Sequence, residues 1–196
     1  MNESQQSPRT LEGSRQDEEL VGRCRHGDEN AWAELIDKYK NLIYSIPIKY
    51  GFARDDANEI FQAVCLTLLS ELSSLREPRA LPAWLIKTTS RRCVRFRKEE
   101  RHTSDPKPTE LEPPANESDI PELLIRQLEQ EQIVRDALND VGPVCRQIIE
   151  LLFYREPPVS YDEAASLLGM AKGSMGATRM RCLDKLRRQL ENRGLR

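Results

Sequence analysis

The sequence predicts an all-α protein of two small helical domains joined by a flexible, proline-rich linker, with a helix-turn-helix in the C-terminal domain. Three observations lead to this prediction. Apolar residues recur at helical spacing on both sides of residues 103–121. That segment itself holds five prolines among Ser, Thr, Asp and Glu, which disfavours regular structure. Near the C-terminus, a helix-capping sequence, a glycine and an arginine-rich segment follow one another.

The composition argues against several classes of protein. Of the 196 residues, 38% are hydrophobic and 32% are charged, which is typical of helix-rich soluble domains. No apolar run approaches the roughly 20 residues that span a bilayer, so we expect no membrane insertion. Residues 1–16 are expected to form a disordered tail, and they lack the apolar segment of a secretory signal. A cytoplasmic protein is therefore expected.

The cysteines and histidines give no sign of a catalytic or metal site. Five cysteines are scattered without paired C-x-x-C spacing, so we expect neither a disulfide framework nor zinc, and we interpret most of them as small buried apolar residues. Two histidines, without a glycine-rich phosphate loop or a nucleophile–base pattern, leave little from which to build an active site. We expect no enzymatic activity, no cofactor and no small-molecule substrate. The cysteines are Cys24, Cys65, Cys93, Cys145 and Cys182.

The first helices of the N-terminal domain, residues 17–102, are expected over 17–25 and 28–49. Gly27 separates them, and Pro47 should kink or end the second. A third helix over 54–75 has the clearest apolar series, with one core face and an opposite face that carries Glu59, Gln62 and Thr67. That opposite face is either solvated surface or a docking surface for a partner helix. The apolar series is Ala57, Ile60, Phe61, Val64, Cys65, Leu68, Leu69 and Leu72.

A loop and a strongly basic helix complete this domain. The loop over 73–79 carries Arg76 and Arg79, and Pro82 opens a helix through Trp84 and Leu85. Basic residues then recur at spacings of three and four with an aromatic residue among them, a pattern that suits single-stranded nucleic acid. The alternative is a plain solvated surface, with Trp84 as a core anchor. The stripe consists of Lys87, Arg91, Arg95 and Lys98, with Phe96 between them.

The formal net charge of −2 hides two basic segments. Residues 87–101 hold seven basic and two acidic residues, and residues 172–196 hold eight basic and two acidic residues. Between them, residues 105–136 hold nine acidic and three basic residues. Because phosphate binding depends on local positive potential, the chain can bind DNA at two places.

The C-terminal domain, residues 122–196, contains the helix-turn-helix. Ser160 and Glu163 have capping-box spacing and predict a helix start, and Gly169 predicts its end. A second helix is expected from near Lys172, suited to a DNA major groove. Helices over 123–138 and 143–154 should pack under it. The alternative is an ordinary helical hairpin with a solvated basic face, made by Arg179, Arg181, Lys185, Arg187 and Arg188.

The order of these parts over residues 17–190 resembles an RNA polymerase sigma factor of the sigma-70 family, in its small two-domain extracytoplasmic-function (ECF) form. Residues 56–62, Asp-Ala-Asn-Glu-Ile-Phe-Gln, resemble the helix that docks on the beta-prime clamp helices. The Trp84-Leu85 helix with its preceding loop resembles the part that opens and reads the minus-ten element. Residues 169–175, Gly-Met-Ala-Lys-Gly-Ser-Met, followed by 178–186, Thr-Arg-Met-Arg-Cys-Leu-Asp-Lys-Leu, resemble the helix that reads the minus-thirty-five element.

The resemblance implies three binding sites and a set of partners. The partners are core RNA polymerase, through its beta-prime clamp helices and beta flap, promoter DNA, and an anti-sigma protein of the kind the family commonly uses. The core-polymerase site would use Asp56, Glu59 and Gln62. The minus-ten site would use Arg76, Arg79, Lys87, Arg91, Arg95 and Phe96. The minus-thirty-five site would use Lys172, Ser174, Thr178, Arg179 and Arg181.

Two segments depart from the family pattern. Ala63 stands where an acidic residue is frequent, and Ser90-Arg91 with Arg95 replaces an Arg-Asn-x-x-x-Asp pattern. The alternative function is a helix-turn-helix transcriptional regulator that binds duplex DNA without core polymerase, which would not need the clamp-like helix. A DNA-acting enzyme, such as a recombinase, would require a serine nucleophile or a carboxylate cluster that the sequence does not display.

Overall fold

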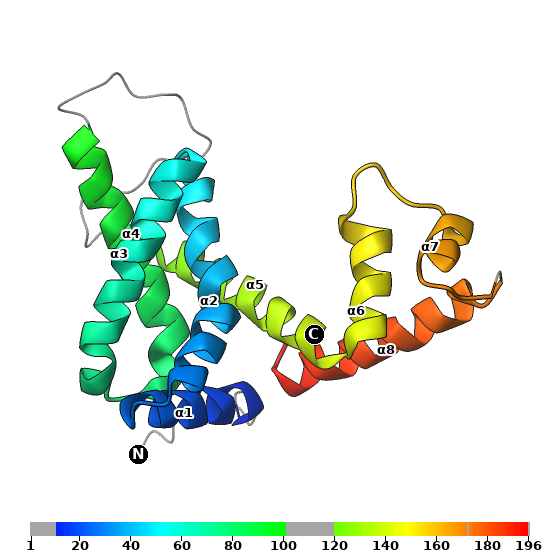
Figure 1. Ribbon diagram of the computed structural model, residues 1–196, viewed down its shortest axis with the longest axis horizontal. Coiled ribbons are helices and arrows are strands. Elements are labelled where there is room, and N and C mark those ends of the chain that lie inside the picture. The colour runs from blue at the N-terminus through cyan, green and yellow to red at the C-terminus, as the bar shows by residue number, and fades with distance from the viewer. Residues whose placement is uncertain (1–10, 101–119, 172, 196) are drawn as a thin grey trace, which may run out of the picture. The chain divides into compact units, whose positions relative to one another are not determined.

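The computed structural model describes residues 11–100, 120–171 and 173–195. All regular structure within these ranges is helical, which confirms the predicted all-α class. No helix in the described part is long and apolar enough to cross a membrane. Of the expected linker over 103–121, only Ile120 and Pro121 belong to the described residues. The α-helices are α1 (Leu11–Arg25), α2 (Glu29–Lys49), α3 (Arg54–Glu71), α4 (Leu81–Glu100), α5 (Glu122–Asp140), α6 (Pro143–Ile149), α7 (Tyr161–Leu167) and α8 (Met175–Asn192) (Figure 1).

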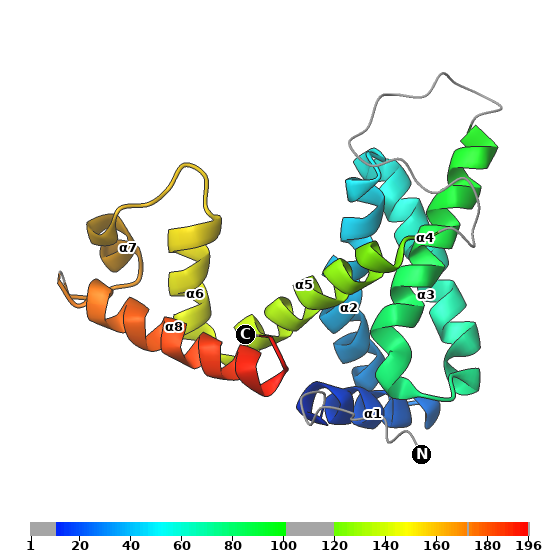
Figure 2. The ribbon, with the colours of Figure 1, turned by 180° about the vertical axis from the view of Figure 1, so that it is seen from behind.

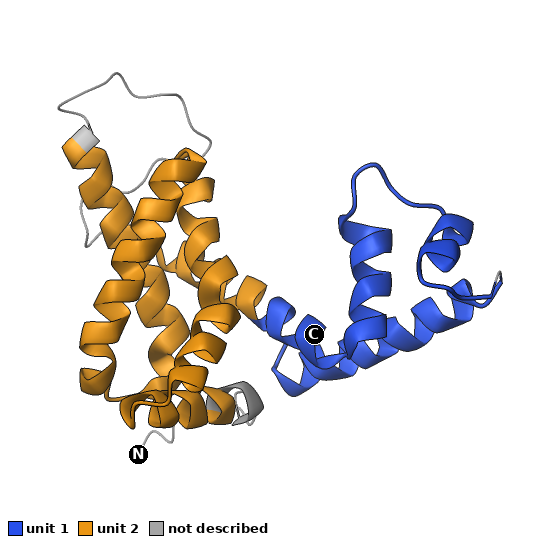
Figure 3. Cartoon of the chain, viewed as in Figure 1, with its two compact units in different colours: residues 1–13, 133–196 blue, residues 14–132 orange. Residues whose placement is uncertain are grey.

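The chain divides into two compact units, which we describe separately. The N-terminal unit comprises residues 14–132, and the C-terminal unit comprises residues 133–196 together with 1–13 (Figure 3). The division falls inside α5. Its first half therefore belongs to the N-terminal unit, although we expected the whole helix to pack under the helix-turn-helix.

In the N-terminal unit, α2, α3 and α4 pack side by side in pairs, and α1 lies across one end of this group (Figure 2). Their shared core also takes in Ile125 and Leu128 of α5, which are 5% and 0% exposed. Sequence periodicity showed that α5 is amphipathic, but it could not show which apolar surface covers that face. Large, fully buried members of this core include Leu35, Tyr39, Leu42, Ile43, Ile46, Ile60, Leu68 and Leu85.

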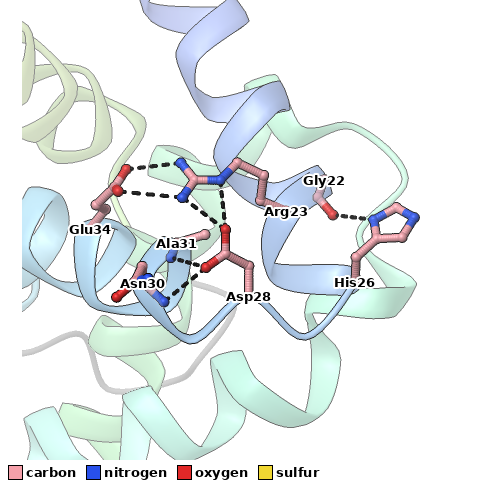
Figure 4. A network of polar contacts seen from close by, with 7 residues as sticks. All are labelled: Gly22, Arg23, His26, Asp28, Asn30, Ala31 and Glu34. Atoms are coloured by element: carbon pink, nitrogen blue, oxygen red, sulfur yellow. Dashed lines mark hydrogen bonds and ion pairs between the residues drawn. The ribbon is translucent and has the colours of Figure 1, made fainter.

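The joint between α1 and α2 is fixed by Asp28 (Figure 4). Its carboxylate accepts hydrogen bonds from the backbone N–H of Asn30 at 2.9 Å and of Ala31 at 3.1 Å, which caps α2. Arg23 pairs with the same carboxylate at 2.8 Å and with Glu34 at 3.2 Å. The Ala31 N–H first, and then the Arg23 guanidinium, lower the pKa of Asp28. The cap at the start of α2 is therefore reinforced by an ion pair.

The ends of these two helices differ slightly from expectation. Helix α1 begins at Leu11, six residues before the expected start at Asp17. Pro47 lies within α2, but the helix ends only two residues later, at Lys49. Pro47 has no backbone N–H to donate to the carbonyl of Ile43, so α2 lacks one hydrogen bond in its last turns and ends soon afterwards.

In the C-terminal unit, α7 and α8 follow one another in the predicted order and are joined by a turn. The Ser160 hydroxyl accepts a hydrogen bond from the backbone N–H of Glu163 at 3.2 Å, and α7 begins at the next residue, Tyr161. Gly169 takes a φ of +63°, in the left-handed region that ends a helix. Helix α8 begins at Met175 rather than near Lys172, because Gly173 takes a φ of +87° in the turn.

One expectation about the cysteines was wrong. Cys145 of α6 and Cys182 of α8 form a disulfide, with their Cα atoms 5.1 Å apart. The two residues are separated by 37 positions and lie on different helices, so no local spacing motif identified them as a pair. For the other three cysteines, the expectation of burial holds for Cys24 and Cys93, which are buried, and in part for Cys65, which is half-buried.

Candidate nucleic-acid interface

One exposed face of α3 combines polar and apolar side chains. Glu59 and Gln62 are exposed, as expected of the polar face. Leu66 and Leu69 lie on the same side of the helix, at helical spacing from Gln62, and are 68% and 60% exposed. We call these four residues the α3 face. Asp56, one turn before Glu59, is half-buried.

Two features of the α3 face differ from the sequence prediction. Leu69 was expected in the core and is exposed, and Leu66 was not considered. Leu68 and Leu69 are adjacent, so only one of them can occupy the centre of the buried stripe, and Leu68, 1% exposed, does so. The signal that could have identified the face was a leucine, Leu66, one turn after Gln62 on an otherwise polar surface.

A cavity of about 170 Å³ lies between α3 and α4 beside this face. We call it the arginine groove, because three arginines of α4 line it. Arg92 forms long ion pairs of 3.9 Å with Glu59 and with Glu99, so it joins the groove to the α3 face. The lining residues are Ala63, Val64, Thr67, Glu71, Trp84, Thr88, Arg91, Arg92 and Arg95.

The basic stripe of α4 is present on the surface. Lys87, Arg91, Arg95 and Lys98 are all exposed, as their spacing predicted. Two of the four, Arg91 and Arg95, also line the arginine groove. Local positive charge and a half-buried indole, Trp84, thus meet on one side of α4, an arrangement suited to phosphates and bases.

Phe96 does not belong to this surface. It is 8% exposed and meets the ring of Phe52 edge to face, with ring centroids 5.7 Å apart. The Arg97 guanidinium lies over the ring of Phe52, 4.2 Å from its centroid. Arg97 also donates a hydrogen bond to the Tyr50 carbonyl at 2.9 Å. Successive helical residues point about 100° apart. Phe96, which directly follows Arg95 of the exposed stripe, therefore points into the core, and a base cannot stack on its ring.

The loop between α3 and α4 is anchored to α1. Arg25 donates to the Leu72 carbonyl at 3.2 Å and to the Leu75 carbonyl. Arg79 pairs with Glu18 at 2.6 Å, and its side chain remains 57% exposed. Arg76 is also exposed. Both predicted arginines thus lie on the surface of this loop. Arg25 holds the loop backbone in place, a role that the sequence did not reveal.

In the C-terminal unit, four of the five predicted residues gather at the start of α8, whereas Lys172 lies outside the described residues. The Ser174 hydroxyl donates to the Ala171 carbonyl at 2.7 Å, and the Thr178 hydroxyl donates to the Ser174 carbonyl at 2.9 Å. Arg181 donates to the Thr178 hydroxyl at 3.2 Å. Arg179 donates to the Tyr161 hydroxyl and lies 5.7 Å from the centre of its ring. These contacts hold both arginines near the first turns of α8.

A hollow in the C-terminal unit is wide and is lined by several apolar side chains. It encloses about 570 Å³. Tyr154 and Leu167, which line it, are 64% and 56% exposed, so the hollow is open to solvent. The lining residues are Gln147, Glu150, Leu151, Tyr154, Arg155, Leu167 and Leu168.

Comparison with known families finds a match within the N-terminal unit. Residues 35–103 match the family described as Sigma-70 region 2. The match takes in most of α2 and all of α3 and α4, and therefore the α3 face, the arginine groove and the basic stripe. No curated protein matches the chain.

Proposed function

We propose that this chain, whose residues 35–103 match Sigma-70 region 2, is a sigma factor that binds core RNA polymerase and the minus-ten element. In this proposal it directs promoter-specific initiation as a two-domain factor of the ECF type. In this proposal, α3 holds core polymerase and the surface of α4 holds the minus-ten strand. The C-terminal unit holds the minus-thirty-five element. Catalysis belongs to the polymerase.

The α3 face is the proposed site for the beta-prime clamp helices. Glu59 and Gln62 offer polar contacts at one end, and Leu66 and Leu69 offer apolar area at the other. Exposed leucines are costly to leave in water, and their burial against a partner helix would supply most of the binding free energy. Asp56 is half-buried and would contribute long-range charge more than contact area.

The minus-ten strand is proposed to follow the exposed side of α4 and the loop before it. Lys87, Arg91 and Arg95 would track the phosphates, and the arginine groove beside Trp84 would admit an unstacked base. Unstacking a base costs a few kcal/mol, which contacts in the groove must offset. Arg76 and Arg79 would hold the strand from the loop. The ion pair of Arg79 with Glu18 is exposed and worth at most about 1 kcal/mol, so a phosphate could replace Glu18.

For the C-terminal unit, we propose major-groove binding through the start of α8, with Ser174, Thr178, Arg179 and Arg181 at the DNA and Lys172 next to them. The wide hollow around Tyr154 and Leu167 fits an apolar protein segment, for which the beta flap is the proposed occupant. An anti-sigma protein would act by covering one of these surfaces. All of these events take place where the polymerase is, in the cytoplasm.

The observation that carries the proposal is the direct connection between the α3 face and the arginine groove. Glu59 belongs to the first and pairs at 3.9 Å with Arg92 of the second. A polymerase helix on α3 and a DNA strand on α4 would therefore be neighbours. A regulator that acts on duplex DNA alone has no use for an exposed apolar helix at this place.

The test is transcription by sigma-free core polymerase on a library of promoter fragments, with and without the purified chain. Initiation at defined sites that depends on the chain supports the proposal, and the start sites reveal both promoter elements. The double variant Arg91→Ala/Arg95→Ala should lose binding to single-stranded minus-ten DNA and show a weaker salt dependence. Arg126→Ala is the matched control, because Arg126 is an exposed arginine of α5 in the same unit. Duplex binding without binding to core polymerase would favour the regulator instead.

A further inference from the structure

The disulfide between Cys145 and Cys182 lies inside the unit that carries α8. Cys145 is the third residue of α6, and Cys182 lies in the middle of α8. Both belong to the buried core of the C-terminal unit and are 7% and 1% exposed. The bond therefore joins α6 to α8, the helix that we propose for DNA binding.

The segment enclosed by the bond is nearly the whole helix-turn-helix. The bridge spans 37 positions, which include the rest of α6, all of α7 and the turn at Gly169. They also include the first part of α8, with Ser174, Thr178 and Arg179. A cross-link that closes a loop of this length reduces the number of conformations open to the unfolded chain and so favours the folded unit.

This unit depends strongly on those two sulfur atoms because its core is small. Eight buried residues form the core cluster of the described part of the unit, and two of them are the bridged cysteines. Small domains bury a small fraction of their surface and are correspondingly marginal without a cross-link. The eight are Val141, Cys145, Ile148, Ile149, Ala164, Ala165, Met175 and Cys182.

We propose that Cys145 and Cys182 are a reversible dithiol–disulfide pair, which makes promoter binding by the C-terminal unit respond to the thiol–disulfide balance. The bridged form holds α8 folded against α6, and the dithiol form loosens it. The link to promoter binding rests on the function proposed above. The link between oxidation and the stability of the unit does not depend on that function and can be tested separately.

The chemistry requires an oxidant of the low-molecular-weight disulfide class, such as glutathione disulfide. The Cys145 thiolate, the more exposed of the two, attacks one sulfur of that disulfide, and one glutathione thiolate leaves. The Cys182 thiolate then attacks the Cys145 sulfur, and the second glutathione thiolate leaves. The two cysteine protons end on the two glutathione thiols. Two protein thiols are oxidised and one glutathione disulfide is reduced.

The other three cysteines are poor competitors. Cys24, Cys65 and Cys93 all lie in the N-terminal unit. Burial raises the pKa of each thiol, that of Cys93 to about 12, so little of the reactive thiolate is present at neutral pH. None of these three forms a disulfide within the described residues, whereas the Cα atoms of Cys145 and Cys182 lie 5.1 Å apart, so oxidation by a mild disulfide should select the Cys145–Cys182 pair.

The experiment uses the full chain after treatment with either glutathione disulfide or dithiothreitol. Non-reducing peptide mapping identifies the bond, and limited proteolysis across a temperature series measures the unfolding midpoint of residues 133–195. We expect the 145–182 bond alone in the oxidised sample. On reduction, we expect the midpoint to fall by about 10 °C or more. Anisotropy of a labelled 30-base-pair mixed-sequence duplex, used as probe, should show a loss of binding on reduction.

Variants separate the pair from the other thiols. Cys24→Ser/Cys65→Ser/Cys93→Ser should keep the full response, and Cys145→Ser should abolish it. If Cys145→Ser does not fold, reduced and oxidised wild-type protein still give the decisive comparison. A bond between other cysteines, no bond, or equal midpoints in the two samples would overturn the inference. None of these results would affect chain-dependent initiation by core polymerase, so the two proposals can fail separately.

Discussion

The exposed leucines of α3 give the sharpest test of the proposed polymerase surface. The perturbation is Leu66→Ala/Leu69→Ala, which removes apolar area from the α3 face without touching the core. Because the two side chains are 68% and 60% exposed, the free protein should unfold with a free energy changed by at most about 0.5 kcal/mol per residue.

The cost should appear on binding. Complete burial of a leucine side chain is worth about 1.5–3 kcal/mol, and roughly two thirds of each side chain remains to be buried by a partner. Allowing for the β-carbon that alanine keeps, the double variant should lose about 2–3 kcal/mol. This corresponds to roughly a 30- to 150-fold rise in Kd for core polymerase.

The assay is titration of labelled chain with core polymerase, read by fluorescence anisotropy. Leu123→Ala is the matched control, because Leu123 is 78% exposed and belongs to another helix of the same unit, α5. Its Kd should stay within twofold of wild type. A double variant that binds as tightly as this control would refute the assignment of the α3 face to polymerase.

Three further predictions concern the folded framework, and urea denaturation followed by circular dichroism measures each. Asp28→Ala should destabilise the N-terminal unit by about 1–2 kcal/mol through loss of the α2 cap, whereas Asp28→Asn should keep most of it. Folding lowers the pKa of Asp28, so the stability contributed by its charge is complete above the unfolded-state pKa and is lost as the pH falls through the folded-state pKa. The difference in unfolding free energy between wild type and Asp28→Asn should therefore shrink in acid. A difference that grew in acid would contradict this. Leu128→Ala should cost about 2–5 kcal/mol, since Leu128 is fully buried, while Leu123→Ala on the same helix should be nearly neutral; equal small losses would mean that α5 does not pack in this core. Gly169→Ala should cost about 1 kcal/mol because its φ is +63°, although space is free for a β-carbon, whereas Gly176→Ala within α8 should stabilise slightly; the opposite order would place the helix end elsewhere.

The candidate sites were predictable where the signal was a spacing within one helix. The basic stripe of α4 is exposed as its three- and four-residue spacing required, and Glu59 and Gln62 lie on the surface of α3. Phe96 was misassigned because its neighbours in sequence are basic while its neighbours in space are Phe52 and the core. The arginine groove needed two helices to form, so no single periodicity could show it.

The sequence by itself determined where most of the helices lie and where some of them begin or end. Asp28, Ser160 and Gly169 act through hydrogen bonds and backbone angles within a few residues, and that information lies in a short stretch of chain. Only the tertiary structure decided that Leu128 belongs to the N-terminal core and that Cys145 meets Cys182. The physical reason is that the hydrophobic effect is non-directional. An apolar helix face therefore predicts that it will be buried, but not against which surface. Contacts between residues far apart in sequence are settled when whole helices pack.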